Sequence, residues 1–233
     1  MNDLLDGLRQ AISLLLSGDA DTWRIIGLSL HVTGLALLIS AMLGVPLGAL
    51  LGLRAFPGRG LVVALVYTGM GLPPVVAGLL VYLLLSRAGP LGGLGWLFTP
   101  RAMIVAQSLI SLPLIAGLTS AAVQSIDPAL RLQVRSLGAT PAQMLRAVLW
   151  EARSSVIVAI LAGFGSIISE VGAVMLVGGN IQGETRVLTT AIVLETRTGA
   201  FDRALALAVV LLAITFAING LVLRLQGRLQ HGG

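Results

Sequence analysis

The chain alternates long apolar stretches with short polar ones. No charged residue lies between Arg24 and Arg54, and 60–86, 102–126 and 204–223 are equally free of charge. A helix needs about 20 apolar residues to cross the hydrocarbon core of a bilayer. The pattern therefore predicts membrane spans at residues 25–52, 61–85, 102–125, 155–177 and 204–223.

Two other segments differ from these spans in length or composition. Residues 187–194 are apolar but too short to cross a bilayer, which predicts a re-entrant or interfacial segment. Residues 1–22 hold four aspartates, with leucine and isoleucine at helical spacing, and favour either a helix on the membrane surface or a frayed tail. Their acidic start is not typical of a signal peptide, which begins with basic residues.

Glycines and prolines mark where the spans are expected to pack closely or to bend. Gly44, Gly48 and Gly52 follow one another at four-residue spacing, which places a flat face on one helix where another backbone can approach. Proline inside a helix removes a hydrogen bond and kinks or breaks it. The positions expected to do so are Pro46 in the first span, Pro73 and Pro74 in the second, and Pro113 in the third.

The amino-acid composition is also typical of a protein that lies in a lipid bilayer. Of 233 residues, 56% are hydrophobic and 11% are charged, and the mean hydropathy is +0.97. Soluble domains usually carry about a quarter charged residues. We therefore expect one all-α transmembrane domain over residues 1–233, with about five spans.

The side chains available for chemistry exclude several classes of function. The sequence has no cysteine and only two histidines, His31 and His231, which leaves little for a zinc or haem site or for a membrane-embedded enzyme. All fifteen basic residues are arginine and lie between the spans, with few aromatics to stack on bases, so they indicate membrane topology rather than nucleic-acid binding. A phosphate-binding glycine loop ending in Gly-Lys-Ser/Thr is also absent from the sequence. We expect no catalytic residue and no bound cofactor or metal.

The longest polar stretch, residues 127–153, carries clear helix signals. Asp127 followed by Pro128 is typical of a helix start, and Gly138 of a helix end. Thr140 and Gln143 then have the spacing of a capping box at the start of a second helix.

The second helix of this stretch is expected to be amphipathic. Met144, Leu145, Val148 and Leu149 fall on one face, and the charged residues fall elsewhere. Two short helices joined by a tight Gly-Ala-Thr corner form either a linker on the membrane surface or a rigid knob offered to a soluble partner. A capped helix transmits push and pull, whereas a flexible loop does not.

This polar stretch resembles the cytoplasmic coupling loop of ABC importer permeases, which carries Glu-Ala-Ala, then Gly, then a distant Ile-x-Leu-Pro. Gly138 and the overall layout match, whereas the residues at 132–134 and 148–151 differ from the family's letters. The resemblance implies that a cytoplasmic ATPase subunit docks on Gly138, Ala139, Thr140, Pro141, Gln143, Met144 and Leu145.

The resemblance extends over most of the chain. Residues 71–92 and 178–204 resemble tungstate permeases, and residues 169–180 are similar to molybdate and sulfate permeases. The resemblance implies the type I ABC importer permease fold in the inner membrane, with tungstate as the expected oxyanion and molybdate or sulfate as alternatives. It also implies a second copy of the chain, two ATPase subunits that use ATP and magnesium, and an extracytoplasmic binding protein.

Glu170 is the single charge inside the fourth predicted span, where a carboxylate is costly unless it faces a cavity or a partner. One hypothesis makes it a gate or packing residue, as Pro73 and Pro74 would be at their own break. Another is a carboxyl hydrogen-bonded to Ser166 or Ser169, and a third is a proton relay in a proton-coupled carrier. Because an anion path disfavours an unpaired negative charge, we expect a structural role.

The arginines favour an N-terminus outside the cell and a C-terminus in the cytoplasm. In that orientation the inner loops carry eight arginines and two acids, Asp127 and Glu151. On the outer side, Arg186, Arg197 and Arg203 either attract an oxyanion or pair with nearby acids and contact the binding protein. We favour the second interpretation, because a strong anion site would retain the ion.

Overall fold

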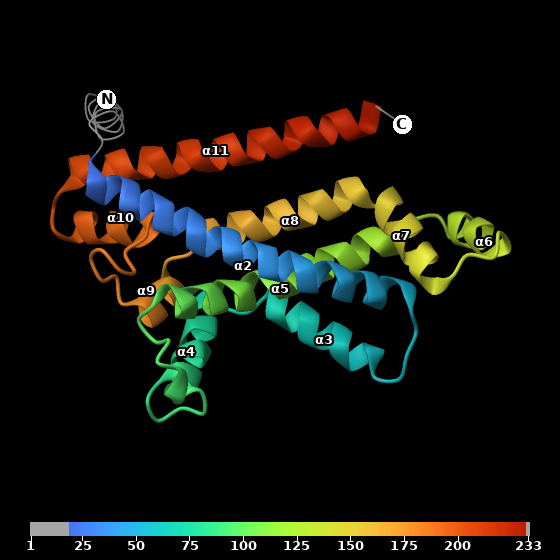
Figure 1. Ribbon diagram of the computed structural model, residues 1–233, viewed down its shortest axis with the longest axis horizontal. Coiled ribbons are helices and arrows are strands. Elements are labelled where there is room, and N and C mark those ends of the chain that lie inside the picture. The colour runs from blue at the N-terminus through green and yellow to red at the C-terminus, as the bar shows by residue number, and fades with distance from the viewer. Residues whose placement is uncertain (1–18, 232–233) are drawn as a thin grey trace.

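Helices make up most of residues 19–231, the part of the chain that this computed structural model describes (Figure 1). The surface segment expected at 1–22 lies outside the described residues up to residue 18, and its last residues begin the first described helix. In chain order the elements are α2 (Ala20–Leu53), α3 (Arg59–Met70), α4 (Pro74–Leu85), the 3-10 turn η1 (Gly92–Leu94), α5 (Pro100–Gln124), α6 (Pro128–Ser136), α7 (Pro141–Glu151), α8 (Arg153–Ile168), α9 (Gly172–Gly178), α10 (Leu188–Arg197) and α11 (Phe201–His231).

Three of the described helices are long and apolar enough to cross a membrane alone, namely α2, α5 and the Phe201–Arg224 part of α11. They confirm the spans expected at 25–52, 102–125 and 204–223. Two further spans arise when a bent pair counts as one, α3 with α4 and α7 with α8. The fold therefore provides three to five spans, and the expected five require both bent pairs.

The span expected at 61–85 is two helices bent by 107°. α3 ends at Met70, Pro73 is extended with φ −58° and ψ 128°, and Pro74 takes the first turn of α4. Two successive prolines remove two backbone donors and push the preceding residue out of the helical region. The break predicted at these prolines is confirmed.

The prediction of one continuous helix over 155–177 is wrong. α8 already begins at Arg153 and ends at Ile168, and α9 starts only at Gly172. Glu170 lies in the gap, and its carboxylate accepts a hydrogen bond from the backbone N–H of Ala173 in α9. A charged acceptor for an orphan N–H stabilises a new helix start at this point, even though the flanking residues are apolar.

The break predicted at Pro113 is also wrong, because α5 is continuous through this residue. The ring of Pro113 packs on α3, where a Cβ added to Gly69 would lie 2.8 Å from the proline Cβ and Cγ. In membrane helices, neighbouring helices and local adjustments compensate for the lost hydrogen bond, so proline is tolerated. α2 likewise continues as one helix through Pro46.

The close approach predicted for the four-residue glycine repeat is confirmed at the contact between α2 and α5. A Cβ at Gly48 would lie 2.3 Å from the carbonyl oxygen of Ala116, and one at Gly44 would lie 3.1 Å from that of Leu112. Small residues at this spacing let two backbones meet, and in lipid such packing holds helices together. Figure 1 shows α2 and α5 side by side along the long axis of the molecule.

The two ends of the molecule carry different elements. α6 and α7 lie at one end, together with the C-terminal end of α11 (Figure 1). The start of α2 lies at the other end with α10, the helix that covers the predicted re-entrant segment 187–194 and packs on α11. Each end forms a distinct polar site.

Candidate functional site

The polar stretch between α5 and α8 forms a rigid elbow, which we define as residues 127–151. The carboxylate of Asp127 accepts from the N–H of Ala129 at 2.8 Å, so it caps the start of α6 as predicted. Gly138 has φ +76°, a left-handed conformation that glycine adopts without steric cost. The N–H of Ala139 then reaches the carbonyl of Val134 at 3.3 Å, which satisfies one of the last carbonyls of α6.

The second helix of the elbow begins with the predicted capping box. The N–H of Gln143 donates to the hydroxyl of Thr140 at 3.3 Å, and the N–H of Thr140 donates to the side-chain oxygen of Gln143 at 2.8 Å. Pro141 occupies the first turn, where its missing N–H costs nothing. Both helices of the elbow thus begin with local side-chain caps, so the corner between them is stiff.

The apolar face that the sequence predicted for α7 attaches the elbow to the spans. Val148 is fully buried against Ala49 of α2 and Val123 of α5, and Met144 and Leu145 pack around the same cluster. α7 then passes into α8 through Ala152 alone, with a bend of 73°. Any force on the elbow is therefore transmitted directly to α2, α5 and α8.

The structure divides the predicted docking residues into two groups. Gly138, Thr140, Pro141 and Gln143 are exposed on the elbow surface, whereas Ala139, Met144 and Leu145 are half-buried. The first group is available to a partner, and the second is largely used in holding the elbow in place.

The elbow also exposes apolar side chains that the sequence reasoning missed. Leu137 is 86% exposed, Leu132 is 67% exposed and Trp150 is 65% exposed. The Trp150 ring also stacks on the guanidinium of Arg153 at 5.0 Å. An apolar residue immediately before a helix-ending glycine in a polar loop, as at Leu137, is the signal that could have found this surface. Large exposed apolar side chains on a polar elbow are candidates for contact with a partner.

The break at Glu170 lies close to the break at Pro73 and Pro74. A Cβ at Gly172 would lie 2.8 Å from Cγ2 of Val75, the residue that follows Pro74. Further along the same pair of helices, α4 and α9 approach so closely that a Cβ at Gly78 would lie 2.6 Å from the Cα of Ala173. The structure thus brings together all three residues predicted as gate or packing residues, within one helix-to-helix contact.

Polar side chains from two other elements hold the Glu170 break. Gln107 of α5 donates from Nε2 to the carbonyl of Ile167 at 3.0 Å, near the end of α8. Thr189 of α10 donates to the carbonyl of Glu170 at 3.0 Å. The alternative in which Ser166 or Ser169 bonds the Glu170 carboxylate is not observed, because both hydroxyls donate to carbonyls of their own helix. The carboxylate instead accepts from the N–H of Ala173 at the start of α9.

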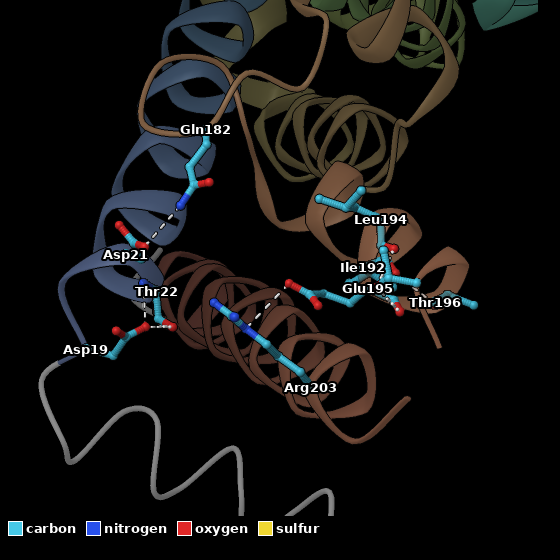
Figure 2. A network of polar contacts seen from close by, with 10 residues as sticks. Asp19, Asp21, Thr22, Gln182, Ile192, Leu194, Glu195, Thr196 and Arg203 are labelled. Carbon is cyan, nitrogen blue, oxygen red and sulfur yellow. Dashed lines mark hydrogen bonds and ion pairs between the residues drawn. The ribbon is translucent and has the colours of Figure 1, made fainter. Parts of the chain in front are cut away.

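The opposite end of the molecule carries a polar cluster, drawn in Figure 2. Gln182 donates to the carboxylate of Asp21 at 3.3 Å, which ties the 179–187 loop to α2. Arg203 of α11 lies 3.5 Å from the carboxylate of Glu195 on α10, as the pairing interpretation predicted. A small cavity of about 150 Å³ lies among these side chains and is also lined by Arg24.

Comparison with known proteins defines the class. Residues 44–231 match the family of binding-protein-dependent transport system inner membrane components, and the chain belongs to this family. It has the fold of type I ABC importer permeases. The methionine ABC transporter MetNI in an inward-facing conformation has a chain with a TM-score of 0.76 and 20% identity, covering 91% of this chain and 97% of that one.

Sequence relatives narrow the class further. The chain is 43% identical to a probable anion ABC transporter permease of Haloferax volcanii, over 88% of this chain and 90% of the relative. It is 40% identical to the tungstate uptake system permease TupB of Peptoclostridium acidaminophilum, over 97% of this chain and 99% of the relative. The chain is thus a multi-pass permease of the ABC importer class, similar throughout its length to permeases for anions.

Proposed function

We propose that this chain forms the translocation path of an ATP-driven importer for tungstate. The observation that carries the proposal is the 40% identity to a tungstate permease over 97% of the chain. Molybdate and sulfate are the alternative oxyanions, and selectivity among the three would reside in the separate binding protein. The chain itself would bind no cofactor and perform no chemistry.

The elbow supports coupling to a cytoplasmic ATPase. It offers a capped corner with exposed Gly138 and Gln143 beside the exposed Leu137, and its far side is anchored on α2 and α5. In the proposed assembly, two copies of the chain surround the path and each elbow docks on one of two ATPase subunits. ATP and magnesium act in those subunits, and an extracytoplasmic binding protein delivers the oxyanion.

The proposed orientation places the N-terminus outside and the C-terminus in the cytoplasm. The C-terminal end of α11 lies at the elbow end of the molecule, and the start of α2 lies at the other end (Figure 1), which supports this orientation. Protease or labelling maps that placed Gly138 outside the cell would contradict it, because no ATP-driven subunit could then reach the elbow.

Transport assays test the energy source and the substrate together. Whole cells, or proteoliposomes with the ATPase side and ATP inside and the binding protein outside, are expected to accumulate tungsten without a proton gradient, measured by elemental mass spectrometry. Uptake that persists without ATP and stops with a protonophore would instead identify a proton-coupled carrier. Competition by excess molybdate or sulfate ranks the three oxyanions.

Glu170→Gln separates the structural role from a proton relay. The amide oxygen of glutamine can still accept from the N–H of Ala173, so the α9 cap is kept while the titrating group is removed. We expect ATP-driven uptake near the wild-type rate. Glu170→Leu removes the cap and is expected to destabilise the α8–α9 break by about 1 kcal/mol. Loss of uptake in Glu170→Gln, with normal assembly and ATPase docking, would contradict a purely structural role.

A further inference from the structure

A groove of about 600 Å³ runs between the elbow and the end of α2. It adjoins the corner at Gly138, and some of its lining residues belong to the predicted docking set, but it is separate from the polar cluster of Figure 2. The residues that line it are Pro46, Leu50, Leu53, Arg54, Arg131, Arg135, Ala139, Pro141, Met144 and Leu145.

The charged side chains of this groove are all positive. Arg54 follows the end of α2, and Arg131 and Arg135 lie on α6. Among the described residues that line the groove, none is aspartate or glutamate. Three guanidinium groups around one groove favour an anion, and guanidinium is especially suited to phosphate because its planar fork donates two parallel hydrogen bonds.

The opposite wall of the groove is apolar and belongs to a membrane span. Pro46 and Leu50 are exposed side chains of α2, one of the helices long enough to cross a bilayer. Pro46 lies seven residues before Leu53, which corresponds to about 10 Å along the helix axis. The groove therefore has a cationic rim at the end of the span and an apolar wall that continues into it.

We propose that this groove binds an anionic phospholipid, with its phosphate at Arg54 and Arg135 and an acyl chain along Leu50 and Pro46. A charged head and an apolar tail match the polarity of the groove along its length. A free phosphate would leave the apolar wall uncovered. A soluble protein would have to extend about 10 Å along a membrane span to fill it. The residues assigned to the lipid are not among those expected to dock the ATPase, so the two kinds of binding can be tested separately.

Lipid binding by the purified full-length chain tests the proposal. Native mass spectrometry measures binding of phosphatidylglycerol and of phosphatidylcholine with the same acyl chains. We expect wild type to prefer phosphatidylglycerol, and the double variant Arg54→Gln/Arg135→Gln to bind it about tenfold more weakly, with phosphatidylcholine binding unchanged. Arg131 is kept, because its Nη2 donates to the carbonyl of Val123 and holds the start of the elbow.

A matched control removes the same charge elsewhere. Arg146 and Arg224 are exposed arginines that do not line the groove, so Arg146→Gln/Arg224→Gln is expected to keep the preference for phosphatidylglycerol. Equal weakening in both double variants would overturn the proposal, since it would reflect net charge alone. If inorganic phosphate displaced phosphatidylglycerol as effectively as unlabelled phosphatidylglycerol does, the proposal would also be overturned, and the groove would be a site for a free anion.

A second measurement uses the wild-type chain, so it does not depend on the folding of a variant. Photoactivatable phosphatidylglycerol is expected to crosslink to peptides containing Leu50 and Arg135. Crosslinks spread evenly over the exposed spans would overturn the proposal. If the ATPase protected these peptides without added lipid, the groove would belong to the protein interface instead. Co-purification of the ATPase with each double variant is scored separately, so failure of lipid binding remains distinct from failure of docking.

Discussion

The two ends of this permease are held together by different kinds of contact. At the elbow, helix starts are capped by side chains three or fewer residues away, as at Asp127 and in the pair Thr140 and Gln143. At the opposite end, contacts join residues far apart in the chain. The hydroxyl of Ser29 accepts from the N–H of Leu188, 159 residues later.

This difference bears on how each end can work. A corner held by its own sequence keeps its shape when the spans move, which suits a part that a separate motor pushes. An end held by contacts between α2, α10 and α11 keeps its shape only while those helices keep their positions. It therefore suits a surface that changes with the state of the transport path. Damage to one end should therefore leave the function of the other end intact.

The largest effect is expected where the elbow is anchored. Val148→Asp places a carboxylate in a fully buried site between Ala49 and Val123, and an unpaired buried charge costs about 3–5 kcal/mol. We expect loss of ATPase co-purification and a lower melting temperature. Leu137→Asp makes the same kind of change at an 86% exposed position and should keep the melting temperature while weakening docking. A wild-type melting temperature in Val148→Asp would contradict the anchoring role.

The next effect is expected at the opposite end. Ser29→Ala leaves the buried N–H of Leu188 without its acceptor, which costs about 1–3 kcal/mol. Thermal unfolding should shift down and oxyanion uptake should fall, while the ATPase still co-purifies. Ser136→Ala is the control on the elbow, because that hydroxyl makes only an exposed bond to the nearby carbonyl of Gln133. If Ser29→Ala abolished ATPase docking, the two ends would be coupled more tightly than we infer.

A matched pair of glycines gives a smaller effect. Gly138 and Gly199 each lie just after the end of a helix and have positive φ values of +76° and +80°. A Cβ added to either glycine would meet no atom within 4 Å. Alanine at each should therefore cost a similar 1–2 kcal/mol, roughly, from the left-handed backbone alone. Only Gly138→Ala is expected to weaken ATPase binding, measured by co-purification. Equal weakening by Gly199→Ala would show that strain, rather than the place of the corner, determines docking.

The contrast between the ends also explains what the sequence could predict. The caps of the elbow follow from residue types at fixed short spacing, so Asp127, Thr140 and Gln143 were assigned correctly. The approach of α2 to α5 also followed from a local pattern, the glycine repeat. The contacts of Ser29 with Leu188 and of Asp21 with Gln182 depend on which distant segments become neighbours, and no local pattern encodes this.

Helix breaks inside apolar stretches were the harder part to predict. Pro73 and Pro74 break their span, whereas Pro113 does not, because its ring packs against Gly69 on a neighbouring helix. Glu170 breaks its span by capping α9, with the carbonyl ends around it held by Gln107. A hydropathy pattern shows where apolar residues lie, but it does not show which group a single carboxylate bonds. The start of a new helix at Gly172 could therefore not be seen in the sequence, and the helix expected at 155–177 is too long.

The smallest effect is expected from acid at the start of α2. The hydrogen bond from the Thr22 hydroxyl lowers the pKa of Asp19, and the Thr22 N–H adds to the effect. The pKa of Asp19 is lower in the folded protein than in the unfolded chain, so the ionised cap stabilises the helix at a pH above the unfolded pKa. This stabilisation is lost as the pH falls below about 4. Trp23 is half exposed in this turn, so its fluorescence or the exchange of nearby amides should report opening in acid. Asp19→Asn keeps an acceptor but removes the titration, and the acid transition at this end should disappear. The same transition in wild type and variant would show that another group controls it.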